Sequence, residues 1–260
     1  MLSRPLDILA IAAHRDDVEQ TCGGTLLKAA QRGQRAGILD LTQGEMGTRG
    51  TADDRAREAA DAAKILGVQW RRALDIPDGR VENTWENRLK VATVIRETRP
   101  RVVILPYWKG RHPDHSTASV LAYEACFLAG LAKLDPQKAL RTQHSAGSSV
   151  GDGKEGDGLA AHRPFKIIYA TLYYDIRPTF VVDITEQFEG KFASILAYQS
   201  QFSDQEAGKD LFPAHDEIHA RVAAMARFYG MLGGVTYAEP FLQKEVGLVE
   251  DLLALPVKSI

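Results

Sequence analysis

The sequence DILAIAAHRDDVE, residues 7–19, indicates the fold of the whole chain. Its first seven residues are almost entirely apolar, as in a short strand that is covered on both faces of a sheet. Similar runs recur as AGILDL at residues 36–41 and VVIL at residues 102–105. Segments with helical spacing of apolar side chains separate the three runs. Strands and helices that alternate in this way predict an α/β fold.

The remaining sequence extends this alternation toward the end of the chain. We predict helices at residues 21–31, 55–66, 87–98, 116–131, 186–200 and 216–230, and further strands at residues 166–174 and 179–183. The expected architecture is Rossmann-like, a mostly parallel sheet with helices on both faces. Because no internal repeat or linker divides the sequence, residues 1–260 are expected to form a single domain.

One segment, residues 142–163, departs from this pattern. It is rich in glycine, serine and charged residues and contains almost no apolar side chains. Such a segment cannot offset the entropy cost of ordering by burial. We predict a mobile surface loop, either a tolerated insertion or a lid, and assign no function to His144 and His162 within it.

The composition excludes several classes of protein. A formal net charge of −2 gives no electrostatic basis for binding nucleic acid or an anionic membrane surface. No stretch approaches the roughly 20 apolar residues of a membrane span, and the N-terminal residues do not have the pattern of a signal peptide. Cys22 and Cys126 are far apart, which argues against a disulfide framework. A cytoplasmic protein is therefore expected.

The HRDD sequence in the opening stretch combines an imidazole with two carboxylates. His14 and Asp17 are three residues apart, so one turn of chain can direct both at a single cation. A metal-dependent hydrolase needs ligands that leave one coordination position for water. It also needs a nearby carboxylate, here Asp16, that accepts the proton of that water. Taken alone, the same residues also fit a helix cap or a surface ion pair.

A second cluster, RHPDH, lies a few residues after the predicted strand at residues 102–105. One of its histidines, His112 or His115, can complete a His-Asp-His metal site. The other can stabilise an oxyanion or protonate a leaving amine, and Asp114 can orient either ring. Taken alone, the cluster also fits a turn. Because parallel sheets place ligands at the carboxyl ends of their strands, we expect both clusters to share one metal site.

These two clusters resemble the hallmarks of the PIG-L/LmbE family of zinc deacetylases, AHPDDxE near the N-terminus and HPDH about a hundred residues later. Further segments resemble the bacillithiol-pathway branch of that family, the N-acetylglucosaminyl-malate deacetylases. They are GGTLLKAAQRGQ (23–34), GTADDRAREAADAAKILG (50–67), LPYWKGRHPDH (105–115), FVVDIT (180–185), AYQSQF (197–202) and YAEPF (237–241). The resemblance covers nearly the whole chain except residues 142–163.

The resemblance implies a role for each residue of the two clusters. One Zn²⁺ per chain would be held by His14, Asp17 and His115. Asp16 would be the general base, and His112 would stabilise the transition state.

Three residues outside these assignments also match positions of the family. By this resemblance Arg55 would contact the substrate, and Arg111 would lie near the site. Tyr198 would either cover the metal or pack in the core.

The chain departs from the family pattern at Arg15, which replaces the proline of HPDD. Proline restricts its own backbone and that of the preceding residue, so its loss is expected to loosen the loop that presents His14. We expect Arg15 to point to solvent or toward an anionic group of the substrate.

The resemblance implies an N-deacetylase, a hydrolase that acts on a small amino-sugar conjugate. N-acetylglucosaminyl-L-malate is the favoured substrate, and another N-acetylglucosamine conjugate or a chitin oligomer is the alternative. A different class, a non-catalytic nucleotide-binding or regulatory α/β domain, would bind no stoichiometric zinc. Relatives in this branch form trimers and hexamers, so a homo-oligomer is expected.

Overall fold

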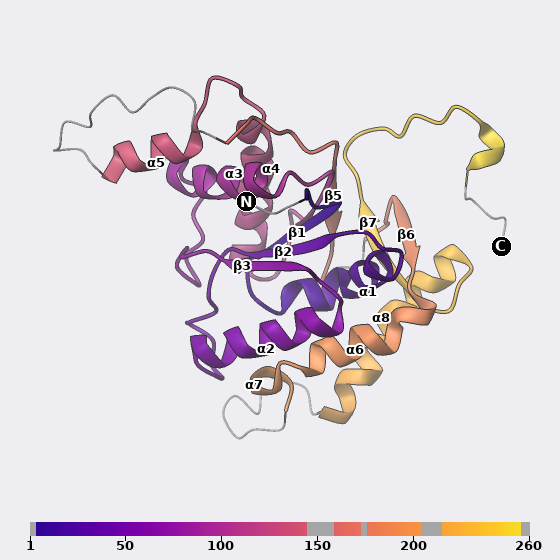
Figure 1. The fold of residues 1–260 in the computed structure, drawn as a ribbon. Coiled ribbons are helices and arrows are strands. Elements are labelled where there is room, and N and C mark those ends of the chain that lie inside the picture. Colours follow the sequence, from indigo (N-terminus) through magenta and orange to yellow (C-terminus); the bar gives the residue numbers. More distant parts are fainter. Residues whose placement is uncertain (1–3, 145–158, 173–175, 204–214, 256–260) are drawn as a thin grey trace.

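A seven-stranded sheet lies at the centre of the molecule in the computed structural model, which describes residues 4–144, 159–172, 176–203 and 215–255 (Figure 1). The strands are β1 (Ile8–Ala12), β2 (Ala36–Asp40), β3 (Trp70–Ala73), β4 (Val102–Pro106), β5 (Lys166–Ala170), β6 (Phe180–Asp183) and β7 (Ala238–Leu242). Their order is β3-β2-β1-β4-β5-β7-β6. All pairs up to β5 are parallel, and β7 runs antiparallel to both neighbours. The predicted mostly parallel α/β fold is confirmed.

Helices cover both faces of the sheet. They are α1 (Asp17–Gln31), α2 (Ala52–Ile65), α3 (Trp85–Thr98), α4 (Pro113–Ala129), α5 (Pro136–His144), α6 (Phe188–Leu196), α7 (Gln199–Phe202) and α8 (His215–Gly233), with short 3-10 turns η1 (Thr185–Gln187) and η2 (Leu252–Ala254). Side chains alternate along β1 between two cores. Leu9 and Ile11 pack with α3 and α4, whereas Ala10 and Ala12 pack with α1 on the opposite face.

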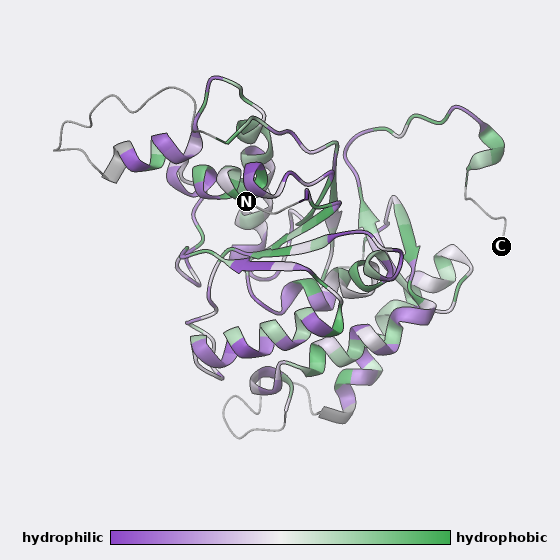
Figure 2. Ribbon diagram, viewed as in Figure 1, coloured by the Kyte–Doolittle hydropathy of each residue, from purple (hydrophilic) through white to green (hydrophobic). Residues whose placement is uncertain are grey.

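Two strands lacked a recognisable sequence signal. The edge strand β3 carries Arg71 and Arg72 and is shown as hydrophilic in Figure 2. Strand β7 contains Glu239 and Pro240, residue types that are depleted in strands. Because neither strand has an apolar run or a clean alternation, neither was predicted.

The predicted loop at residues 142–163 is partly wrong at its ends. Helix α5 extends to His144, and His162 lies 2.7 Å through Nε2 from the carbonyl oxygen of Pro100. Arg96 in α3 also donates to the carbonyl oxygen of Leu159. The rest of the predicted loop, residues 145–158, lies outside the described residues.

Helix α1 is broken at Cys22, where φ is −139° and ψ is 18°. The carboxylate of Glu239 accepts hydrogen bonds from the free backbone N–H groups of Gly24 and Thr25 at 2.9 and 2.7 Å. A side chain at Gly24 would clash with Ile184 at 2.9 Å, so this glycine permits close packing against the segment before η1. Strand β7 therefore holds the second half of α1 in place.

Among the residues that the structure describes, no helix combines the length and the apolar character needed to cross a membrane.

Candidate metal centre and active site

The two clusters meet at one edge of the sheet because β1 and β4 are parallel neighbours. HRDD follows β1 and opens α1, while RHPDH follows β4 and opens α4. Pro113 occupies the first turn of α4, a position that proline favours. The structure thus brings together residues that are about a hundred positions apart in the chain.

His14, Asp17 and His115 direct their side chains at a common point. His14 Nδ1 lies 3.2 Å from His115 Nε2 and 3.4 Å from Asp17 Oδ2. His115 Nε2 lies 3.1 Å from Asp17 Oδ1. One ligand atom from each residue lies within 4.8 Å of the others. Two imidazoles and a carboxylate that leave a further position open form the donor set of a catalytic zinc-type site, so these residues fit a divalent metal ion.

Two carboxylates contact the ring nitrogen of His14 that faces away from the proposed ion. His14 Nε2 lies 3.0 Å from Asp78 Oδ1 and 3.5 Å from Asp114 Oδ2. Asp114 also accepts from the backbone N–H groups of Gly79 and Val81, at 2.8 and 3.2 Å. A carboxylate on the far nitrogen fixes the tautomer of a histidine ligand. His14 is therefore held with Nδ1 facing the proposed ion.

The charges around this point favour a cation. Burial alone would lower the pKa of His14, but hydrogen bonds to Asp114, Asp17 and Asp78 outweigh it and raise that pKa to about 12. Burial would likewise raise the pKa of Asp17, yet His115 and His14 hold it well below its usual range. The site is therefore electrostatically suited to a divalent ion.

Asp16 stands beside the three candidate ligands and does not belong to their set. Its Oδ1 forms an ion pair with Arg55 Nη2 at 2.9 Å, and its Oδ2 accepts from Gln20 Nε2 at 3.3 Å. The Arg55 guanidinium is buried. Arg55, the predicted substrate contact, thus holds the candidate base and does not line either of the two cavities described below.

His112 is the N-cap of α4, and its Nδ1 accepts a hydrogen bond from the backbone N–H of Asp114 at 3.2 Å. A neutral ring that accepts at Nδ1 carries its proton on Nε2. The His112 ring lies 4.7 Å from that of His14, measured between centroids. His112 therefore offers a donor next to the metal site, while the Asp114 carboxylate contacts His14 instead.

The expectation for Arg15 is wrong. Its side chain is buried, and Nη1 donates to the carbonyl oxygen of Ala52 at 2.6 Å. The carbonyl oxygen of Arg15 accepts from Arg71 and from the hydroxyl of Tyr198. These contacts hold the loop where the family has proline. Tyr198 is fully buried with Ala59, so it packs in the core and does not cover the metal site.

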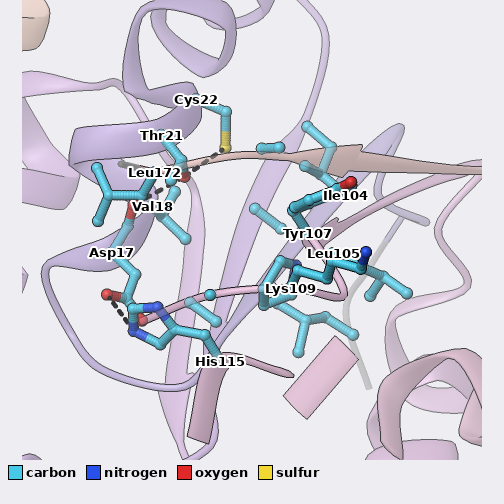
Figure 3. Close-up of a pocket in the computed structure, with 16 residues that line it drawn as sticks. Asp17, Val18, Thr21, Cys22, Ile104, Leu105, Tyr107, Lys109, His115 and Leu172 are labelled. Carbon is cyan, nitrogen blue, oxygen red and sulfur yellow. Dashed lines mark hydrogen bonds and ion pairs between the residues drawn. The ribbon is translucent and has the colours of Figure 1, made fainter. Parts of the chain in front are cut away.

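Two cavities adjoin the centre. The smaller, of about 30 Å³, is bounded by Asp17 and His115 at one end and extends between α1 and the carboxyl ends of β1, β4 and β5 (Figure 3). The larger has a volume of about 800 Å³, and its wall includes Asp16, Arg111 and His112. Thr21 and Leu172 line both cavities. The candidate base and the candidate donor therefore face the larger cavity.

Asp78 is a site residue that sequence reasoning missed. It follows β3, whose carboxyl end lies at the same edge of the sheet as those of β1 and β2. The polar residues just after this third parallel strand could have indicated Asp78. Because β3 itself was not predicted, the sequence offered no reason to place them at the site.

Comparisons with known proteins agree with this geometry. The model of the PIG-L family, described as GlcNAc-PI de-N-acetylase, matches residues 9–126, which include both clusters. The diacetylchitobiose deacetylase of Thermococcus kodakarensis is 31% identical over 243 residues, spanning 89% of this chain and 80% of that protein.

Solved structures share the fold over most of the chain. A conserved protein of Thermus thermophilus is 38% identical and superposes with a TM-score of 0.76, covering 94% of this chain and 98% of that one. The N,N'-diacetylchitobiose deacetylase of Pyrococcus horikoshii is 26% identical with a TM-score of 0.72, covering 90% of this chain and 82% of that one. The chain therefore belongs to the PIG-L family of metal-dependent de-N-acetylases.

Proposed function

We propose that this protein is a zinc-dependent hydrolase that removes the N-acetyl group from an N-acetylglucosamine conjugate. The observation that carries the proposal is the convergence of His14, Asp17 and His115 beside a cavity whose wall contains Asp16 and His112. Ligands, base and donor come from two strand ends, with Asp17 and His115 bordering the smaller cavity and Asp16 and His112 bordering the larger one.

Each of these residues has its own part in the reaction. When bound by its three ligands, zinc supplies a water of lowered pKa and polarises the acetyl carbonyl. Asp16, held by Arg55, accepts a proton from the water as its oxygen bonds to the carbonyl carbon. His112 donates from Nε2 to the charge that develops on the carbonyl oxygen. The C–N bond then breaks, a proton passes to the amine, and acetate and the free amino sugar leave.

The smaller cavity is suited to the acetyl methyl group. Its volume of about 30 Å³ accommodates one or two atoms of the size of a water oxygen. Apolar side chains of Val18, Ile104 and Leu172 line it, and Asp17 and His115 lie at one end. We place the methyl group there, with the carbonyl group at the metal centre.

Two conjugates are the first candidates for the substrate. The sequence resemblance favours N-acetylglucosaminyl-malate, and Arg111 on the cavity wall offers a cation to its carboxylates. The diacetylchitobiose deacetylases among the relatives favour a chitin disaccharide.

The test is an amine-release assay on both conjugates with metal-stripped and zinc-restored protein. We expect turnover only after zinc is restored, and loss of zinc binding in the His115→Ala variant. Stripped protein that takes up no stoichiometric zinc and shows no turnover would instead favour the non-catalytic class.

A further inference from the structure

The larger cavity is much longer than the metal centre requires. From Asp16 after β1 and His112 after β4, its wall continues past Thr171 at the end of β5. It then reaches Ala238–Pro240 of β7 and the face of α8. Since β1, β4, β5 and β7 follow one another in the sheet, the cavity crosses the sheet edge, with the metal centre at one end and α8 at the other.

The end formed by α8 is mostly apolar. Four of its five lining residues from that helix, Ile218, Val222, Met225 and Ala226, are apolar and recur at the spacing of one helical face, and the fifth is Arg221. Ile195 of α6, Phe202 of α7 and Pro240 of β7 complete this wall. We call these seven apolar residues the α8 wall.

The charged groups near this wall are paired with one another. Lys191 and Glu239 form an ion pair at 2.5 Å, and both side chains are almost fully buried. Arg221 lines the cavity, but its side chain is largely exposed and pairs with Glu217 at 3.0 Å. The distal half of the cavity therefore presents mainly apolar surface, in contrast to the end with Asp16, Arg111 and His112.

The volume leaves room for more than one sugar ring. Cavities of about 300–1,000 Å³ enclose whole drug-sized ligands, and this one measures about 800 Å³. With the acetyl group at the metal, the N-acetylglucosamine ring occupies the polar end, and whatever is attached to that ring extends toward α8.

We infer that the α8 wall is a subsite for an apolar aglycone, so that the preferred substrates are N-acetylglucosamine conjugates that carry an alkyl or aryl group. This inference rests on the proposed function and narrows it. A malyl group that extended to the α8 wall would bring its carboxylates toward mostly apolar side chains and not toward Arg111 at the polar end, and charged groups are costly to desolvate without partners.

The experiment measures kcat/KM for amine release from the methyl, butyl and hexyl glycosides of N-acetylglucosamine with zinc-loaded protein. Each methylene that the wall buries is expected to raise kcat/KM by about fourfold, so the hexyl glycoside should exceed the methyl glycoside by well over tenfold. The malate conjugate should rank below the hexyl glycoside.

Two methionines of α8 give a matched pair of variants. Met225 lines the cavity and is 41% exposed, whereas Met231 is 64% exposed and does not line it. Met225→Asp should bring the ratio of hexyl to methyl kcat/KM close to one, while Met231→Asp should leave the ratio unchanged. Both sites are partly exposed, so both variants are expected to fold.

A binding measurement separates the two proposals. Calorimetry with hexyl and methyl glucosaminide, the amine products, reports on the subsite without turnover, and the hexyl product should bind more tightly only when residue 225 is methionine. Equal turnover and equal binding of the two chain lengths would overturn the subsite and leave the proposed function intact. Tight hexyl binding without any turnover would overturn the proposed function and retain the subsite.

Discussion

Asp78 shows how a single carboxylate outside the metal ligands can control the site. Its Oδ1 lies 3.0 Å from His14 Nε2, which leaves Nδ1 to face the ion. We expect Asp78→Asn to lower zinc affinity by about 10- to 100-fold, the usual effect of removing such a supporting partner. Competition with a chelating dye measures the zinc affinity.

Asp75→Asn in the same loop is the control, because the Asp75 carboxylate is exposed and pairs with Lys90. Equal zinc affinity of the Asp78 and Asp75 variants would show that Asp78 does not orient His14.

Arg55 offers a second test at the scale of the residue. Its contact with Asp16 predicts that Arg55→Ala lowers kcat by about 10- to 100-fold, because a misplaced base loses part of a contribution of roughly 10²- to 10⁴-fold. A direct substrate contact would instead raise KM. Steady-state kinetics separates the two, and Arg57→Ala on the exposed side of α2 is the control. Zinc affinity should stay unchanged in both variants.

At the scale of the element, the break in α1 is held by a buried ion pair. Glu239 accepts from the backbone of α1 and pairs with Lys191, which also donates to the carbonyl oxygen of Gln20 at 2.8 Å. Removing one member leaves a buried charge without its partner, so Glu239→Gln should lower the free energy of unfolding by about 3–5 kcal/mol.

Urea denaturation of this variant, of Lys191→Met and of the double variant forms a cycle. The double variant should lose clearly less than the two single variants together. Asp61 forms an exposed ion pair with Lys64. Replacing Asp61 should lower the free energy of unfolding by at most about 1 kcal/mol. A loss below that level for Glu239→Gln would mean that the pair does not hold α1.

The smaller cavity, formed by strand ends and α1, predicts acyl specificity. An N-butanoyl group places three carbon atoms beyond its carbonyl group, one more than the cavity of about 30 Å³ is expected to hold. We expect kcat/KM for the N-butanoyl substrate to be about 10- to 200-fold below that for the N-acetyl substrate. Leu172→Ala should narrow this difference, because it removes part of the wall. Equal kcat/KM values for the two substrates in the parent protein would mean that the acyl group does not occupy the smaller cavity.

The elements also show why only part of the fold was predictable. The strands β1, β2 and β4 are buried on both faces, so burial forces apolar residues at nearly every position. In β3, Arg71 is tolerated because Asp40 and Glu19 pair with it at 2.9 and 2.6 Å. Such partners depend on tertiary contacts and leave no local signal in the sequence.

The candidate site, like the fold, was predictable only in part. His14, Asp17 and His115 lie in two short motifs after apolar strands, so topology suggested that the two motifs share a metal site, and the family resemblance selected His115 over His112. The contacts of Arg15 and Tyr198 depend on how α2, α6 and β3 pack around the first motif, which neither spacing nor composition reveals.

At the scale of the whole molecule, the segment after β7 extends away from the body (Figure 1) and exposes apolar side chains. Val246, Leu248, Leu252 and Leu253 are each at least 80% exposed. The start of the segment is fixed, because Lys244 Nζ lies 4.7 to 4.9 Å from the ring centroids of Trp108, Tyr123 and Tyr169. Exposed apolar groups of this kind mark interfaces in soluble proteins.

A second copy of the chain is the partner that we propose for this segment. Helix α4 exposes Val120, Tyr123 and Phe127 next to the anchored start of the segment, so two copies offer each other both an apolar segment and an apolar helix face, as a symmetric interface requires. Light scattering should give a mass of at least twice 28.6 kDa. The double variant Leu252→Asp, Leu253→Asp should shift it toward 28.6 kDa, whereas Ile65→Asp on α2 should not. A parent protein that is monomeric at micromolar concentration would contradict the proposal, because the apolar segment would then remain in water without a partner.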